Sequence, residues 1–97
     1  MVRKIKWTIR AINDLQDIYE FIAKDSKRYA QIQIVNIQDS VSNLLSFPLA
    51  GHKVPELPHL QYREILVGNY RVIYRFEKKQ DIVIIMSVMH GRRLLKG

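Results

Sequence analysis

Residues 62–76 read YREILVGNYRVIYRF and decide the fold, because two runs of strand-forming residues flank a two-residue turn. The runs 62–67 and 70–76 are rich in aromatic and β-branched residues, which favour strands. Between them lie Gly68 and Asn69, and glycine tolerates the positive φ of a tight hairpin turn. The stretch therefore predicts an antiparallel hairpin in which Val67 pairs with Tyr70.

This register sorts the side chains of the hairpin onto two faces, because successive residues of a strand point to opposite sides. Arg71 and Arg75 then share one face with Glu64, which lies opposite Ile73. The other face is more apolar and is expected to lie under the helices; it carries Ile65, Val67, Tyr70, Val72 and Tyr74.

The residues around the hairpin predict two more strands. Residues 82–89 are apolar on both faces, which is typical of an interior strand. Residues 4–9 alternate polar and apolar with a period of two and predict a short strand. Residues 48–60 hold all three prolines and are expected to form an ordered loop that crosses from helices to sheet.

Two helices are predicted between the first strand and this loop. Apolar residues recur at steps of three and four from Ala11 to about Lys24, which indicates an amphipathic helix. Ser26 is suited to cap a second helix, which ends at Phe47 and Pro48.

The order of elements predicts one α+β domain over residues 1–97. It has a short N-terminal strand, a helical hairpin and a three-stranded antiparallel meander, with both helices packed on one sheet face. The opposite face is expected to stay uncovered and concave, so that Arg71 and Arg75 point out of it.

Composition limits the kinds of partner and site. The 97 residues carry 16 basic and 9 acidic side chains, which gives a formal charge of +7 and favours an anionic partner. Residues 49–97 contribute 9 − 4 = +5 of it. Without cysteine there is no disulfide, zinc knuckle or thiol nucleophile. No stretch is long and apolar enough for a signal peptide or membrane span, so a cytoplasmic protein without a membrane partner is expected.

One spacing resembles a metal site. His52, Glu56 and His59 are residue types that bind zinc, but ligands at i, i+4 and i+7 converge only on a helix. Pro55 and Pro58 argue against a helix there. We therefore interpret these histidines as surface-loop residues and expect neither a metal nor a cofactor.

Seven acidic, basic and cationic residues form a set suited to metal-free cleavage of RNA. In that reaction the 2′-hydroxyl attacks the adjacent phosphorus, which needs a base, cations to stabilise the developing charge, and an acid for the leaving oxygen. The set consists of Glu56, Arg63, Arg71, Arg75, His90, Arg92 and Arg93. The residues alone leave a second interpretation open, in which the arginines form a solvated face that protects the sheet against aggregation.

The chain resembles the RelE/ParE superfamily of toxins from bacterial and archaeal toxin–antitoxin systems over essentially its full length. Its motifs are Ala11-x3-Leu15-x2-Ile18-Tyr19-x2-Ile22, Phe47-Pro48-x2-Gly51-x2-Val54-Pro55-Glu56-Leu57, the hairpin quoted above, and Ile84-x3-Val88-x-His90-Gly91-Arg92-Arg93. The resemblance implies a compact toxin that is neutralised by a cognate antitoxin encoded beside it.

The superfamily has two functional branches. RelE-like and YoeB-like members are ribonucleases that cleave mRNA on the ribosome, and ParE-like members poison DNA gyrase. By resemblance to the nucleases, Glu56 is the expected general base, Arg71 the phosphate clamp and His90 the expected acid. The expected RNA-binding residues are Arg63, Arg75, Arg92 and Arg93. These residues make an mRNA endoribonuclease the first hypothesis, with a gyrase poison or an inactive antitoxin-binding homologue as alternatives.

The register of the last hairpin decides which face His90 occupies, and the sequence leaves it open. Pairing of Phe76 with Ile82 would put His90 on the helix-covered face. Pairing of Phe76 with Asp81 would put it on the face of Arg71, and a bulge before His90 would also change its position.

Overall fold

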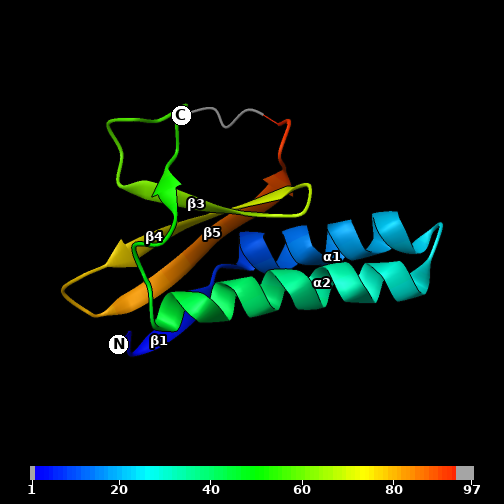
Figure 1. Cartoon of the computed structure of the whole chain (residues 1–97), viewed down its shortest axis with the longest axis horizontal. Coiled ribbons are helices and arrows are strands. Elements are labelled where there is room, and N and C mark those ends of the chain that lie inside the picture. Colours follow the sequence, from blue (N-terminus) through cyan, green and yellow to red (C-terminus); the bar gives the residue numbers. More distant parts are fainter. Residues whose placement is uncertain (1, 94–97) are drawn as a thin grey trace.

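Two helices pack on one face of a five-stranded sheet (Figure 1). The computed structural model describes residues 2–93. Its elements are β1 (Lys4–Trp7), α1 (Ile9–Ala23), α2 (Lys27–Ser42), the short 3₁₀ helix η1 (Asn43–Leu45), β2 (His52–Lys53), β3 (Tyr62–Val67), β4 (Tyr70–Glu77) and β5 (Ile82–His90). Within the described residues, no helix is long and apolar enough to cross a membrane.

Side-chain caps fix the starts of both helices. The Thr8 hydroxyl accepts a hydrogen bond from the Ala11 amide at 3.1 Å, so β1 ends at Trp7 and not at residue 9. The Ser26 hydroxyl accepts one from the Tyr29 amide at 3.1 Å, which confirms the predicted cap of α2. Each cap satisfies an amide that has no partner within its helix.

The strands lie in the order β1-β5-β4-β3-β2. The predicted meander of β3, β4 and β5 is confirmed, and Val67 pairs with Tyr70 around a turn in which Gly68 has a φ of +59°. Two short strands complete the sheet, β1 parallel to β5 and β2 antiparallel to β3. The strand β5 therefore lies inside the sheet, as its apolar sequence predicts.

The main core lies between the sheet and the helices. Alternate residues of β4 and β5 enter it, among them Val72, Tyr74, Val83 and Ile85, all fully buried. From the helices come residues spaced by three or four, such as Ile37 and others of the predicted stripes. The predicted assignment of Val72 and Tyr74 to the helix-covered face is confirmed.

The expectation that the second face stays uncovered is wrong. Val54 and Leu57, from the loop before β3, are buried against Ile73 and Met89 and form a second, smaller core on that face. The loop has no regular apolar period because its backbone follows turns, yet it buries two aliphatic side chains. Arg71, predicted to point into solvent, is consequently only 5% exposed.

A bulge in β5 decides the position of His90. Phe76 pairs with Val83, which is neither of the two registers considered from the sequence. Between the pairs of Tyr74 with Ile85 and of Ile73 with Ser87, the register shifts by one residue. After the shift His90 lies opposite Tyr70, and therefore on the helix side of the sheet.

Asp14 of α1 holds this bulge in place. Its Oδ2 accepts hydrogen bonds from the Ser87 hydroxyl at 2.8 Å and from the Val88 amide at 3.0 Å. Backbone groups next to a bulge need partners outside the regular ladder, and this carboxylate accepts from one such amide and from the neighbouring Ser87 hydroxyl.

We expect Asp14→Ala to lower the free energy of unfolding by about 1–3 kcal/mol, because it leaves two partly buried donors without their acceptor. Asp17→Ala is the matched control, since Asp17 is an exposed carboxylate one turn further along α1. Its cost should stay within about 0.5 kcal/mol. Urea unfolding measures both; equal costs would contradict the role given to Asp14.

Candidate functional site

A buried ion-pair cluster made of Arg71, Glu56 and Glu64, here called the Arg71 cluster, joins β3, β4 and the loop between β2 and β3. Arg71 binds Glu56 through two parallel contacts, Nη1 to Oε2 at 2.7 Å and Nη2 to Oε1 at 2.9 Å. Its Nη2 also donates to Glu64 Oε1 at 2.7 Å. The side chains of Arg71 and Glu64 are only 6% and 5% exposed, so this is an interior cluster.

The loop places Glu56 over the sheet through its buried neighbours. Leu57 donates its amide to the Val54 carbonyl at 3.1 Å, which closes a tight turn around Pro55 and Glu56. Because Val54 and Leu57 are both buried in the second core, the turn is anchored on each side of Glu56. The carboxylate is thereby brought to Arg71 from a position 15 residues earlier in the chain.

The guanidinium of Arg71 is almost fully engaged. Besides its carboxylate partners it donates through Nη1 to the Arg93 carbonyl at 2.8 Å. Its Nε is buried without a hydrogen-bond partner. The hydrogen bond to Glu56 raises the pKa of Arg71 above its already high ordinary value; burial opposes this, and Glu64 adds to it. Arg71 is therefore a permanent cation and does not act as a proton donor.

His52 extends the cluster toward the surface. Its Nε2 lies 3.2 Å from Glu64 Oε2, and its own side chain is 62% exposed. The contact of His52 is thus with Glu64, which is not part of the spacing that resembles a metal site. Within residues 2–93, no three His, Asp or Glu side chains are grouped so that they could hold a metal ion.

His90, the acid expected from the resemblance, lies on the other side of the sheet from the Arg71 cluster. Its ring contacts that of Tyr70 edge to face, with centroids 5.7 Å apart. Its Nδ1 accepts a hydrogen bond from the Arg92 amide at 3.2 Å. The structure thus brings Glu56 and Arg71 together and separates His90 from both.

The four remaining arginines of the predicted set are scattered. Arg63 lies on the helix side of β3 and donates to the Gly51 carbonyl at 2.8 Å. Arg75 shares the face of Arg71, but it is half exposed and pairs with Glu77 at 3.2 Å. Arg92 and Arg93 follow β5 and are exposed. Arg63 and Arg75 therefore lie on opposite faces of the sheet and cannot contact the same phosphate.

Glu64 is the residue of the cluster to which sequence reasoning gave no role. The signal was present, because the hairpin register puts Glu64 on the face of Arg71 and diagonal to it across β3 and β4. A buried carboxylate on a covered face needs a cationic partner, and Arg71 is within reach.

This arrangement links the loop between β2 and β3 to the strands β3 and β4. Two carboxylates and one guanidinium carry a formal charge of −2 + 1 = −1. The Arg71 guanidinium holds the loop to the sheet, and its Nη1 and Nη2 groups donate to partners within the protein.

Comparison with known proteins places the fold. The chain is 26% identical over 93 residues to the protein Y4kP of Sinorhizobium fredii. The alignment covers 94% of this chain and 91% of that protein. A solved chain of the chromosomal ParDE system from P. aeruginosa superposes with a TM-score of 0.70 at 20% identity, covering 90% of this chain and 94% of that one. The toxin–antitoxin complex RelBE2 from Mycobacterium tuberculosis gives a TM-score of 0.61 at 21% identity, covering 93% and 99%.

A family model assigns the sequence itself. The model of the ParE toxin of type II toxin–antitoxin systems, parDE, matches residues 5–95. These residues include the whole sheet apart from Lys4, the first residue of β1. The shared fold and this match over nearly the whole chain lead to one conclusion: the protein belongs to the ParE toxin family of type II toxin–antitoxin systems.

Proposed function

We propose that this protein is a toxin that arrests growth by binding a protein target rather than by cutting RNA. For the ParE branch, the target implied by the resemblance is DNA gyrase. The observation that carries the proposal is the state of Arg71, whose guanidinium is buried and held by two carboxylates.

Cleavage of a phosphodiester needs a cation that is free to stabilise the charge of the transition state. Four of the five N–H groups of Arg71 already donate to Glu56, Glu64 and the Arg93 carbonyl. A phosphate would have to displace a carboxylate from a cluster whose formal charge is −1, which repels it. The geometry therefore favours binding over catalysis.

An antitoxin partner belongs to the same proposal. The similar solved structures from P. aeruginosa and Mycobacterium tuberculosis are toxin–antitoxin systems. With a formal charge of +7, this chain offers electrostatic attraction to an acidic partner, which raises the rate of association.

Ribosome-dependent cleavage of mRNA is the second candidate function, and one observation favours it. Glu56 and Arg71, the general base and phosphate clamp under the resemblance, lie in direct contact at 2.7 and 2.9 Å. This function requires the Arg71 cluster to open on binding RNA, and an acid other than His90.

Expression of the toxin alone, and together with the antitoxin encoded beside it, tests the proposal. We expect growth arrest with accumulated covalent gyrase–DNA complexes, no new mRNA 5′ ends, and rescue by the antitoxin. The reason is that a binding toxin traps its target without cutting RNA. Detergent-trapped gyrase–DNA complexes and mapped mRNA ends are the two measurements.

Glu56→Gln separates the two candidate functions. It removes a general base but keeps an oxygen acceptor for Arg71, so a binding toxin should retain its activity. Loss of a catalytic base would instead lower cleavage about 10²–10⁴-fold. Glu77→Gln is the control, because Glu77 is the half-exposed partner of Arg75. New mRNA ends that depend on Glu56 would contradict the proposal, and an absence of both products would identify an inactive homologue.

A further inference from the structure

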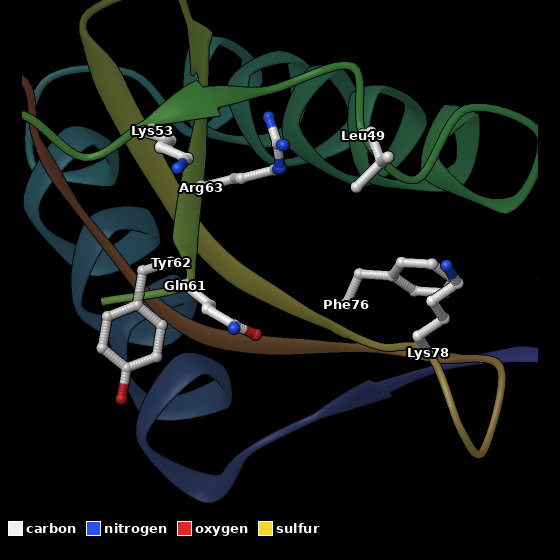
Figure 2. A pocket seen from close by; sticks show the side chains of 7 residues that line it. All are labelled: Leu49, Lys53, Gln61, Tyr62, Arg63, Phe76 and Lys78. Atoms are coloured by element: carbon white, nitrogen blue, oxygen red, sulfur yellow. The ribbon is translucent and has the colours of Figure 1, made fainter. Parts of the chain in front are cut away.

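A pocket separate from the Arg71 cluster lies between the loop before β2 and the ends of β3 and β4 (Figure 2). Its volume is about 320 Å³, at the lower end of the range for small-ligand sites. We propose that it binds an acidic peptide segment carrying one apolar anchor residue, contributed by the antitoxin. The inference rests on the antitoxin part of the proposed function and does not depend on the target of the toxin.

Both apolar and cationic side chains line the pocket. Leu49 and Phe76 flank it on one side in Figure 2, while Lys53 and Arg63 lie on the other and Lys78 projects near the Phe76 ring. None of the described residues that line it is acidic, and three of them, Lys53, Arg63 and Lys78, are cations. A matching ligand therefore needs an apolar group and carboxylates close together.

Two of the lining side chains are held in place before any ligand arrives. Phe76 is half buried and packs against the main core. Arg63 donates one N–H to the Gly51 carbonyl at 2.8 Å, which fixes its guanidinium and leaves other donors for a carboxylate. Preorganised groups lower the entropy cost of binding.

Leu49 supplies the reason to expect an apolar anchor. It is 56% exposed at the mouth of the pocket, opposite the Phe76 ring. An aliphatic side chain inserted between these two would remove apolar surface from water on both sides, which stabilises the complex.

A peptide fits this pocket better than a nucleotide does. Single-stranded nucleic acids are held by aromatic rings that offer a free face to successive bases. Here the Tyr62 ring turns away from the space between Leu49 and Phe76 (Figure 2), and Phe76 packs against the core. The charge complementarity therefore points to carboxylates on a peptide.

Titration of the ¹⁵N-labelled full chain with the peptide acetyl-EELEE-amide maps the site by NMR. We expect saturable shifts at the amides of Lys53, Arg63, Phe76 and Lys78, and none with acetyl-KKLKK-amide. Shifts confined to other surfaces would overturn the proposal. Tighter binding of a thymidine decamer at the same amides would also overturn it, since the pocket would then be a nucleic-acid site.

Charge reversal in the complex with the antitoxin is the second measurement. The double variant Lys53→Glu/Lys78→Glu should weaken the toxin–antitoxin complex at least about tenfold, because like charges would then face each other. Lys24→Glu/Lys27→Glu makes the same change in charge at the exposed connection between α1 and α2, far along the chain from the pocket. It should change affinity less than about threefold.

Equal weakening by both double variants would show a general charge effect and contradict a site at the pocket. Neither measurement uses gyrase or mRNA. A different toxin target would therefore leave this result intact, and failure here would leave the gyrase assay to be judged by itself.

Discussion

Arg71→Ala is expected to lower the free energy of unfolding by about 3–5 kcal/mol, although the removed residue is a polar one. The substitution leaves Glu56 and Glu64 without their guanidinium, and the side chain of Glu64 is only 5% exposed. Removing one partner of a buried ion pair costs more than the pair itself contributes, because an uncompensated charge stays in the interior. Urea unfolding followed by circular dichroism measures the change.

Arg75→Ala is the matched control, because Arg75 lies on the same strand and face. Its pair with Glu77 is 3.2 Å long, and the Arg75 side chain is 41% exposed, so the expected cost is below about 1 kcal/mol. In a Glu64→Gln background, Arg71→Ala should cost less than in the wild type, since one buried carboxylate fewer loses its guanidinium partner. Equal costs for Arg71→Ala and Arg75→Ala would contradict the structural role of the cluster.

Loss of toxicity in the Arg71→Ala variant can have two causes. A catalytic role and a structural role both predict that Arg71→Ala abolishes growth arrest. Only the structural role predicts that the loss follows the fraction of unfolded protein. Toxicity and stability therefore have to be measured on the same variants.

The local parts of the fold could be predicted because their causes are local. Gly68 and Asn69 set the turn and hence the register of β3 with β4. Ser26 starts α2 through a hydrogen bond that spans three residues. In each case the residues that decide the structure are neighbours in the sequence.

The parts that sequence reasoning missed depend on contacts between distant residues. The bulge in β5 is held by Asp14, more than 70 residues earlier, so no pattern within 82–90 could reveal it. The loop that covers Arg71 buries only Val54 and Leu57, which form no periodic pattern. Two features of the candidate site were missed for the same reason: the loop buries Arg71 on the face predicted for it, and the bulge places His90 on the other face.

Tyr74→Ala is expected to have the other large effect, a loss of about 3–5 kcal/mol in the free energy of unfolding. Tyr74 is fully buried and is the largest side chain with almost no exposed surface. Its hydroxyl donates to the Pro48 carbonyl at 2.8 Å and accepts from the Gly51 amide at 2.9 Å. The variant would leave a cavity in the core and release the loop that these bonds hold.

Tyr74→Phe separates the ring from the hydroxyl. It keeps the packing but removes the partner of the Gly51 amide, so we expect a loss of about 1–3 kcal/mol and faster hydrogen exchange at Gly51. Tyr29→Phe is the control, because the Tyr29 side chain is exposed. Its effect should stay within about 0.5 kcal/mol. An unchanged exchange rate at Gly51 would contradict the role of the hydroxyl.

The pH dependence of stability provides an independent check on Tyr74. Burial raises the pKa of its hydroxyl above the ordinary value of 10.0, although the Gly51 amide and the charge of Arg63 oppose the shift. In alkali the unfolded chain therefore releases this proton first. The stability that the protonated Tyr74 hydroxyl contributes is fully present below about pH 10. It is lost as the pH rises through the pKa of Tyr74 in the folded protein. Wild-type protein should consequently lose more stability than Tyr74→Phe as the pH rises above about 10. Parallel curves for the two proteins would show that Tyr74 does not titrate with unfolding.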